Sequence, residues 1–434
     1  MYKFLITLLM MFLFCGVSFG ASPLQTKVNN IINADPLSKK AVVAVSVRDI
    51  KTGAVVVDRQ ASMFLRPAST QKVLTSAAVY NKWGRNYDIK TIVYRFKNDL
   101  YIKVLGDPLL TFEELKKTLE SQSLEGVANV YVDGESVDGQ DFGEGWMWDD
   151  VVSPYVPKYS AFNLDRNLAV IKIIPTDMGV QVPSNAAVKI ENNLKKGTVD
   201  NFKVVYKPWE DAGSVFLEGT VVKEQEIKIP VLFPREYFLN RLKECFPLSV
   251  KIDTQKTHRH AIVQTAHRTV FSDVLREINS NSDNLASESV LKLFAMTQTA
   301  RQGTTKNGIK LVMDFYKSLG LDISKVSMVD ASGVSEYNLV TPDFMTQALF
   351  KIQNMRDFIS FKQSLAQPGK EGTLKNRLSD VPNIYAKTGT HRGYSNIVGY
   401  TDKYVFAIFV QNYKKESKAD AKHLEDKIIR AIAK

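Results

Sequence analysis

Short runs of hydrophobic residues near both ends of the chain predict β-strands. Near the N-terminus, residues 41–47 and 54–58 are rich in valine and flank the turn Lys51-Thr52-Gly53, which predicts a hairpin. Three more strands are predicted near the C-terminus, over residues 383–388, 394–400 and 404–413.

Apolar residues at helical spacing predict helices in the same two regions. Residues 69–83 follow a break at Pro67 and repeat apolar side chains three and four residues apart. Thr341 suits an N-cap and Pro342 a first helical turn. The other predicted helices cover residues 268–278, 285–296, 308–319 and 414–434.

The middle of the chain has a different character, because short strand-like runs there alternate with Gly, Pro, Asp and Asn turns. These runs cover residues 101–105, 127–132, 168–174, 202–206 and 215–222. We therefore predict an α+β fold, in which a discontinuous α+β domain (residues 21–87 and 262–434) is interrupted by a β-rich insertion of two subdomains (residues 88–261).

The first twenty residues predict a signal peptide. Lys3 gives a positive start, residues 4–14 are apolar, and Ser18-Phe19-Gly20 has small residues at the positions that a signal peptidase reads. The alternative is a retained anchor, for which the apolar run is too short. We therefore expect cleavage after residue 20, no stable transmembrane anchor, and an exported protein that is periplasmic or associated with the cell wall.

Composition narrows the range of partners. The chain is 44% hydrophobic and 24% charged, as in globular proteins with large cores, and its formal net charge is +11. A basic surface favours peripheral association with anionic envelope polymers or lipid headgroups, whereas export and scattered basic residues argue against nucleic acid. His258 and His260 have no apparent third ligand, so we expect no metal and no cofactor.

Ser69-Thr70-Gln71-Lys72 is a candidate catalytic motif at the start of a predicted helix. Residues three apart share one helix face, so the amine of Lys72 reaches the hydroxyl of Ser69. A serine becomes an effective nucleophile when a base takes its proton, and a desolvated lysine is such a base. We predict that Ser69 is the nucleophile and Lys72 the general base, with the helix N-terminus adding positive potential for the oxyanion.

Ser282-Asp283-Asn284 is a second candidate motif, in a loop between two predicted helices. In a cleft, Ser282 would relay a proton to Lys72 or to the leaving amine, and Asn284 would hold a substrate amide. Taken alone, the same tripeptide is typical of a helix cap.

Lys387-Thr388-Gly389-Thr390 is a third candidate motif, on a predicted strand. Gly389 has no side chain to keep a substrate backbone away. The hydroxyls of Thr388 and Thr390 are donors for a carboxylate, and Lys387 supplies positive charge.

Two of these motifs have a second copy in the chain. Ser289-Val290-Leu291-Lys292 matches Ser-x-x-Lys, but it lies inside a predicted helix with an apolar stripe, which favours a packed helix interior. Lys51-Thr52-Gly53 matches Lys-Thr-Gly, but it precedes the serine and lies at the hairpin turn, so we interpret it as turn sequence.

The three motifs, in this order, resemble the signature of the penicillin-binding proteins and serine β-lactamases. Positions 69 and 282 are 213 residues apart, and such a long insertion resembles the low-molecular-mass class C penicillin-binding proteins, the D-Ala-D-Ala carboxypeptidase/endopeptidase family. Ala331 and Leu105 depart from the family pattern, where glycine is usual. The local segments that resemble this family are Pro67-Ala68-Ser69, Gly106-Asp107-Pro108, Trp146–Asp150, Ser160–Asn163, Asp330–Ser335, Ala386–Thr390 and Gly399-Tyr400.

The resemblance implies that the discontinuous domain (residues 21–87 and 262–434) is a transpeptidase-like domain, an antiparallel sheet flanked by helices, with one or two extra domains formed by the insertion. It implies that peptidoglycan peptides ending in D-Ala-D-Ala, D-Ala-diaminopimelate cross-links and β-lactams acylate Ser69, and that water hydrolyses the acyl-enzyme. The backbone N–H groups of Ser69 and Thr390 would form the oxyanion hole. Asp149 would recognise a charged amino group of the substrate; the alternative for residues 146–150 is an aromatic packing cluster.

Two other functions fit the same scaffold. A serine β-lactamase would need a dedicated water-activating residue on a compact scaffold, and the long gap between Ser69 and Ser282 argues against it. A non-catalytic wall-binding protein would have lost part of the motif set, whereas all three motifs are intact. Turnover of ampicillin and labelling by a fluorescent penicillin distinguish these functions.

Overall fold

The computed structural model describes residues 22–122, 124–185, 188–209, 213–255 and 262–434. The predicted signal peptide and the pair His258 and His260 lie outside these residues. Helices and several separate sheets are both present, which confirms the predicted α+β class. Within the described residues, no helix has the length and apolar character needed to cross a membrane.

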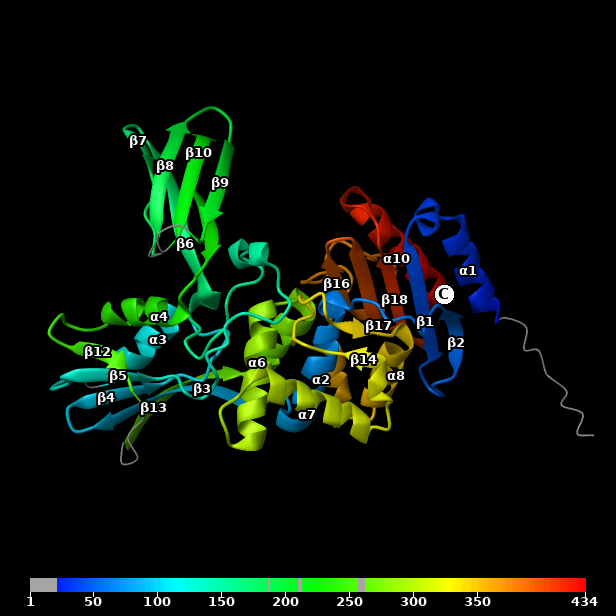
Figure 1. Ribbon diagram of the computed structural model, residues 1–434, viewed down its shortest axis with the longest axis horizontal. Helices are drawn as coiled ribbons and strands as arrows, with labels where there is room; N and C mark the ends of the chain where they lie inside the picture. Colours follow the sequence, from blue (N-terminus) through cyan, green and yellow to red (C-terminus); the bar gives the residue numbers. More distant parts are fainter. Residues whose placement is uncertain (1–21, 123, 186–187, 210–212, 256–261) are drawn as a thin grey trace, which may run out of the picture.

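A five-stranded sheet joins the two ends of the chain, in the order β16-β17-β18-β1-β2 (Figure 1). Strand β1 pairs antiparallel with β18, from Val42 opposite Gln411 to Asp49 opposite Tyr404. The predicted strands of both termini therefore belong to one sheet. Its members are β1 (Val42–Asp49), β2 (Val55–Arg59), β16 (Tyr385–His391), β17 (Tyr394–Tyr400) and β18 (Tyr404–Gln411).

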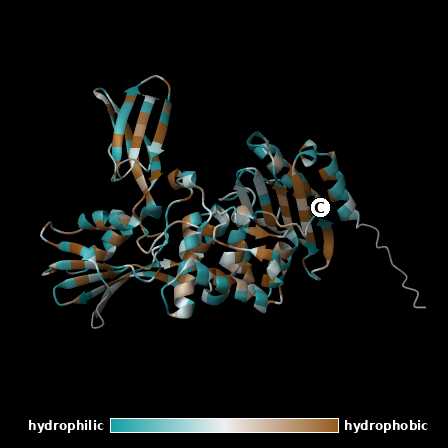
Figure 2. Cartoon of the chain, viewed as in Figure 1, coloured by the Kyte–Doolittle hydropathy of each residue, from teal (hydrophilic) through white to brown (hydrophobic). Residues whose placement is uncertain are grey.

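Helices cover both faces of this sheet. On one face, α1 (Pro23–Ala34) and α10 (Lys418–Ala433) share a core with Val45 of β1. On the other face, α8 (Pro342–Ile352) packs on β1 and β18 and shares a core with Ala407. Because both faces are buried, β17 and β18 are apolar along most of their length instead of alternating with polar residues (Figure 2).

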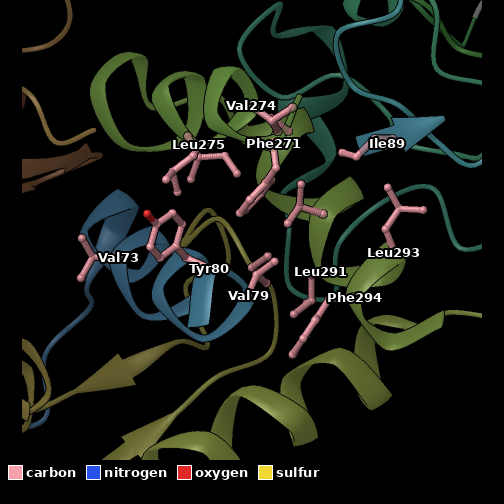
Figure 3. Packing of buried hydrophobic residues seen from close by; sticks show 14 of the residues in the cluster. Val73, Val79, Tyr80, Ile89, Phe271, Val274, Leu275, Leu291, Leu293 and Phe294 are labelled. Carbon is pink, nitrogen blue, oxygen red and sulfur yellow. The ribbon is translucent and has the colours of Figure 1, made fainter. Parts of the chain in front are cut away.

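A group of helices lies beside the sheet, around the central helix α2 (Lys72–Trp83). Every residue of α2 from Lys72 to Tyr80 is buried. Figure 3 shows Val79 of α2 among buried side chains that include Leu291 and Phe294. The neighbouring helices are α5 (Phe271–Arg276), α6 (Asn284–Thr299), α7 (Thr305–Ser318) and α9 (Phe358–Gln363).

The insertion contains a second five-stranded sheet, in the order β12-β5-β4-β3-β13. Helices α3 (Phe112–Glu120) and α4 (Pro234–Lys243) pack against it. Its strands are β3 (Asp88–Phe96), β4 (Asp99–Lys103), β5 (Asn129–Asp133), β12 (Lys251–Thr254) and β13 (Ile262–Val270).

Two three-stranded sheets form a separate unit that projects away from the rest of the molecule (Figure 1). One has the order β8-β10-β9 and the other β11-β6-β7. The insertion is therefore β-rich and contains more than one sheet, as predicted. The strands are β6 (Leu168–Thr176), β7 (Gly179–Gln181), β8 (Lys189–Lys196), β9 (Asn201–Lys207), β10 (Ser214–Val221) and β11 (Gln225–Pro230).

The predicted helix over residues 268–278 is wrong at its start. Residues 268–270 belong to β13, which pairs with β3 in the inserted sheet, and α5 begins only at Phe271. The β-branched Thr269 and Val270 favour this extended conformation. We therefore propose that the chain returns to the transpeptidase-like domain at about residue 271 and not at 262.

Candidate active site

Ser69 lies on the short turn η2 (Ala68–Gln71), which leads directly into α2. The preceding Ala68 has a φ of 46°, a left-handed conformation that is strained for a residue with a side chain. Gly333 packs against this turn so closely that a Cβ at that position would lie 1.9 Å from the carbonyl oxygen of Ala68. The contact requires glycine, and it helps to fix Ser69 at the helix N-terminus.

The amine of Lys72 has three polar neighbours. Its Nζ lies 2.8 Å from Oγ of Ser69, 2.5 Å from Oδ1 of Asn284 and 2.7 Å from the carbonyl oxygen of Ser332. The last two oxygens are acceptors only, so they take two N–H donors from the amine. In the neutral amine, the lone pair then faces the hydroxyl of Ser69, which is the arrangement that proton transfer from serine requires.

Burial controls the protonation of Lys72. The side chain is fully buried, and the loss of hydration lowers its pKa to about 8, although the carboxylates of Asp330, Glu288 and Asp283 act in the opposite direction. Lys387 is also fully buried, and burial together with the charge of Lys72 holds the pKa of Lys387 well below its usual value. A pKa of Lys72 near neutrality leaves a useful fraction of neutral amine to act as a base.

The Ser-Asp-Asn motif forms the turn that starts α6. Ser282 follows the π-helical turn η5 (Glu277–Asn281) and has a φ of 68°. Asp283 caps α6 by accepting a hydrogen bond from the N–H of Ala286 at 2.7 Å, and it pairs with Arg166 of the insertion at 2.5 Å. Within the Ser-Asp-Asn motif, Asp283 is therefore the residue that acts as the helix cap.

The structure brings Asn284, but not Ser282, into contact with the lysine. Oδ1 of Asn284 lies on Lys72, and its Nδ2 donates to the carbonyl oxygen of Tyr155 at 2.7 Å. Ser282 lines a cavity of about 180 Å³ with Asn284 and Tyr155. Among the described residues, Ser282 makes no hydrogen bond to Lys72 or Ser69, so its relay role stays a prediction.

The Lys-Thr-Gly motif lies on β16, which runs alongside η2 at the edge of the main sheet. A Cβ on Gly389 would lie 2.9 Å from the backbone nitrogen of Ser69, so only glycine lets strand and turn approach this closely. The buried amine of Lys387 donates to the carbonyl oxygen of Thr388 at 2.9 Å. Thr390 follows Gly389, and its N–H in an oxyanion hole stays a prediction.

The outer edge of β16 is available for backbone pairing. Within the described part of the chain, it has a single isolated bridge, between Ala386 and Ala366, and no partner strand. An extended peptide can therefore add to residues 387–390 through main-chain hydrogen bonds.

The loop of residues 330–335 is a part of the site whose role the sequence did not reveal. It joins the short strands β14 (Val326–Ser327) and β15 (Leu339–Val340) on its two sides, and it supplies the Ser332 carbonyl to Lys72. The only signal in the sequence was the family-like segment itself. The carboxylate of Asp330 fixes the loop by accepting hydrogen bonds from the N–H groups of Gly333 and Ser335 and from the side chains of Gln71, Asn338 and Trp146.

Asp149 lies on the turn η3 (Trp148–Val152) of the insertion, and it already has a cationic partner. Arg392, between β16 and β17, pairs with Asp149 at 2.9 Å and with Asp150 at 3.3 Å. Trp146, in contrast, is buried and packs edge-on against Tyr159, so the packing-cluster alternative describes this residue. The recognition role of Asp149 stays a prediction.

The second copies of the motifs have structural partners. Ser289 accepts a hydrogen bond from Asn163 at 2.8 Å, inside α6. Lys292 is buried, pairs with Asp138 and lies 4.7 Å from the ring centroid of Tyr159. The structure thus agrees with a packed helix interior. The turn at residues 51–53 is held by Asp49, whose carboxylate accepts from the backbone at 2.8 Å and 3.0 Å.

The fold and the geometry around Ser69 define the class of active-site-serine enzymes that includes the penicillin-binding proteins and serine β-lactamases. Residues 24–434 match the family model described as the D-Ala-D-Ala carboxypeptidase 3 (S13) family. The chain belongs to this family of serine-type D-Ala-D-Ala carboxypeptidases, the low-molecular-mass class C penicillin-binding proteins.

Relatives and solved structures agree with this assignment. D-alanyl-D-alanine carboxypeptidase DacB of Haemophilus influenzae is 22% identical over 433 residues, 88% of each chain. D-alanyl-D-alanine carboxypeptidase of Actinomadura sp. is 26% identical over 412 residues, 84% of this chain and 76% of that protein. The crystal structure of penicillin binding protein 4 (dacB) from H. influenzae has a TM-score of 0.78 at 22% identity and covers 94% of this chain and 99% of its own. The predicted family and fold are confirmed.

Proposed function

We propose that this enzyme is exported and hydrolyses D-Ala-D-Ala termini and D-Ala cross-links of peptidoglycan peptides through an acyl-enzyme on Ser69, and that penicillins inhibit it at the same serine. The observation that carries the proposal is the buried Lys72 amine, 2.8 Å from Oγ of Ser69 and with a pKa of about 8. The sequence of residues 1–20 supports export. Penicillin binding protein 4 (dacB) from Haemophilus influenzae, which is similar to this chain, has been solved in complex with a β-lactam.

Acylation follows from the geometry of the site. Neutral Lys72 takes the proton of Ser69, and Oγ attacks the carbonyl carbon of the penultimate D-Ala. Backbone N–H groups of Ser69 and Thr390 hold the oxyanion, and each such donor is typically worth about 10²–10³ in rate. The bond to the leaving D-Ala nitrogen breaks, and this nitrogen receives the proton from Lys72, relayed by Ser282. Water then takes the place of the leaving amine: it attacks the acyl carbon and gives a proton to Lys72, the bond between this carbon and Oγ breaks, and Oγ of Ser69 regains the proton.

Substrate binding uses the edge of β16. The peptide adds to the strand as an extended segment, and the side-chain amide of Asn284 holds a substrate amide. The terminal carboxylate lies at the hydroxyls of Thr388 and Thr390, near the positive potential of Lys387.

Asp149 recognises an amino group on the substrate side chain in this proposal. Its pair with Arg392 is about half exposed on both sides, so a substrate ammonium exchanges with the guanidinium at small cost. The proximity of Arg392 to β16 supports this position, because the peptide lies along the same strand.

Mass spectrometry of muropeptides after digestion tests the bond specificity. Loss of one terminal alanine marks carboxypeptidase activity, and conversion of cross-linked dimers to monomers marks endopeptidase activity. An enzyme preparation that changes neither substrate and takes up no penicillin would contradict the proposal.

Asp149→Asn tests the recognition of the side chain. A charged hydrogen bond is worth about 1.5–3 kcal/mol, so kcat/KM on a diaminopimelate-type peptide should fall roughly ten- to a hundredfold. A neutral D-Ala-D-Ala peptide and benzylpenicillin should react as before. Asp177→Asn is the matched control, because Asp177 is another exposed carboxylate of the insertion that pairs with a lysine, Lys196. Equal losses on all three substrates would give Asp149 a structural role only.

A further inference from the structure

Glu288 is a fully buried carboxylate one turn after Asn284 on α6. Its Oε1 accepts hydrogen bonds from the backbone N–H of Ser332 at 2.8 Å and of Ala331 at 3.0 Å, and Oε2 lies 3.1 Å from the same N–H of Ala331. Backbone donors of one loop, rather than a basic side chain, therefore hold this carboxylate in place.

Ser332 connects Glu288 to the catalytic amine. Its N–H donates to Glu288, and its carbonyl oxygen accepts from Nζ of Lys72 at 2.7 Å. A shift of the loop at Glu288 would therefore displace one of the two acceptors that orient the amine of Lys72 toward Ser69.

The loop is also fixed from both neighbouring helices. The carbonyl oxygen of Ala331 accepts hydrogen bonds from Thr75 of α2 at 2.9 Å and from Ser287 of α6 at 3.1 Å. Glu288 holds the N–H side of the same peptide unit, whereas the unit that carries the Ser332 carbonyl is completed by the N–H of Gly333, which donates to Asp330 at 2.8 Å. Glu288 therefore acts on the Ser332 carbonyl through the preceding peptide unit, together with Asp330.

The charge of Glu288 acts on Lys72 through a dry interior. The titratable groups that face Glu288 are Lys72 on α2, Asp330 in the loop, Tyr159 in the insertion and Lys292 on its own helix. Burial, and then the neighbouring charge of Asp330, raise the pKa of Glu288 to about 8, so its negative charge is fully present only above that pH. In turn, the carboxylate raises the pKa of Lys72 against the effect of burial.

We propose that Glu288 is a positioning residue for acylation: it helps to hold the loop whose Ser332 carbonyl contacts Lys72, and it brings an acidic group close to the catalytic amine. This rests on the proposed function, because the reaction that Glu288 supports is the acylation of Ser69. Two properties of the side chain are separable: glutamine keeps an acceptor for the Ser332 N–H and loses the charge, whereas alanine loses both.

The test is the pH dependence of acylation by benzylpenicillin, measured by stopped-flow or by intact mass, for the wild type, Glu288→Gln and Glu288→Ala. In Glu288→Gln, the midpoint of the rise in rate should move to lower pH, because the negative charge that favours the ammonium form of Lys72 is gone, with a plateau within a few-fold of wild type. In Glu288→Ala, the plateau should fall roughly ten- to a hundredfold.

Glu425→Gln is the matched control. Glu425 is equally buried, on α10, where it pairs with Arg377 at 2.8 Å, and burial also raises its pKa. The pH midpoint of acylation in Glu425→Gln should equal that of the wild type, because Glu425 lies beside the core shared by α1, α10 and β1.

If the pH midpoint of acylation in Glu288→Gln equals that of the wild type and of the control variant, the charge of Glu288 has no role. If Glu288→Ala does not fold, the Gln variant decides, with its melting temperature measured alongside. An undiminished plateau of folded Glu288→Ala would overturn the positioning role. Absence of penicillin acylation in the wild type would instead refute the proposed function, so the two failures are distinguishable.

Discussion

The two Ser-x-x-Lys segments of this chain have the same spacing and opposite surroundings. Ser69 lies at the start of a helical segment, behind the left-handed Ala68, and its hydroxyl faces the lysine. Ser289 lies within α6, and its hydroxyl accepts a hydrogen bond from Asn163. Position at a helix end, rather than the motif, therefore makes the serine accessible to its lysine.

The two lysines differ in the charge of what they contact. Burial lowers the pKa of both. Among the residues that the structure describes, the hydrogen-bond partners of Lys72 are neutral oxygens, whereas Lys292 pairs directly with the carboxylate of Asp138. An ion pair stabilises the ammonium form, so Lys292 is a structural cation, and the absence of a direct carboxylate leaves Lys72 able to lose its proton.

The largest difference between the two segments should appear on removal of the serines. Ser69→Ala should abolish the covalent penicilloyl adduct, because it removes the hydroxyl that lies 2.8 Å from the amine of Lys72. Ser289→Ala should label as the wild type does. Intact mass and peptide mapping measure both results, and an adduct mapped to Ser289 would reverse the comparison.

Arginine substitutions sharpen the difference between the lysines. Lys72→Arg should slow acylation by roughly two to four powers of ten, because a guanidinium does not deprotonate at neutral pH. Lys292→Arg should keep the charge next to Asp138 and acylate within a few-fold of wild type, by stopped-flow measurement on folded protein. Near-normal acylation by Lys72→Arg would exclude Lys72 as the base.

The pH dependence of acylation should follow Lys72 and not Lys292. Its folded-state pKa of about 8 lies below the usual value, so the reactive neutral amine is lost as the pH falls through 8. The acylation rate should therefore decrease about tenfold per unit below pH 7, to roughly one hundredth of the plateau at pH 6. The midpoint in Lys292→Met should equal that of the wild type; a flat profile between pH 6 and 9 would contradict the assignment.

The smallest effect concerns stability. Lys292→Met should lower the free energy of unfolding by about 1–3 kcal/mol, because it leaves Asp138 without its cation while that carboxylate keeps some access to water. Urea unfolding followed by fluorescence measures the change. The double variant with Asp138→Asn should lose less than the two single losses together, and strict additivity would mean that the pair is not coupled.

The sequence predicted the elements whose apolar pattern is long or continuous. The strands of the main sheet and helices α6, α7 and α8 are examples. The short helix α3 escaped notice although Phe112, Leu115 and Leu119 mark its buried side, because charged residues outnumber them. Residues 268–270 were assigned to a helix because the local signal of Thr269 and Val270 is short, and their pairing with β3 joins residues far apart in the chain.

The same distinction holds for the site. Ser69, Lys72 and Asn284 were found from side-chain types at fixed spacing, and the structure brings them together. The Ser332 carbonyl was not found, because a backbone oxygen has no signature in the sequence. The pair of Asp149 with Arg392 was not found either, because it joins residues 243 positions apart.

The pairing of β1 with β18 has a consequence for the order of folding. Strand β1 is synthesised among the first fifty residues, but its partner ends at residue 411, so the main sheet cannot close until nearly the whole chain is available. Such non-local pairing is slow and leaves strand edges exposed to aggregation. The inserted sheet closes earlier, at residue 270. Because β16 is synthesised later still, a chain truncated before β16 would keep an intact Ser-x-x-Lys segment but would lack the strand that packs against η2.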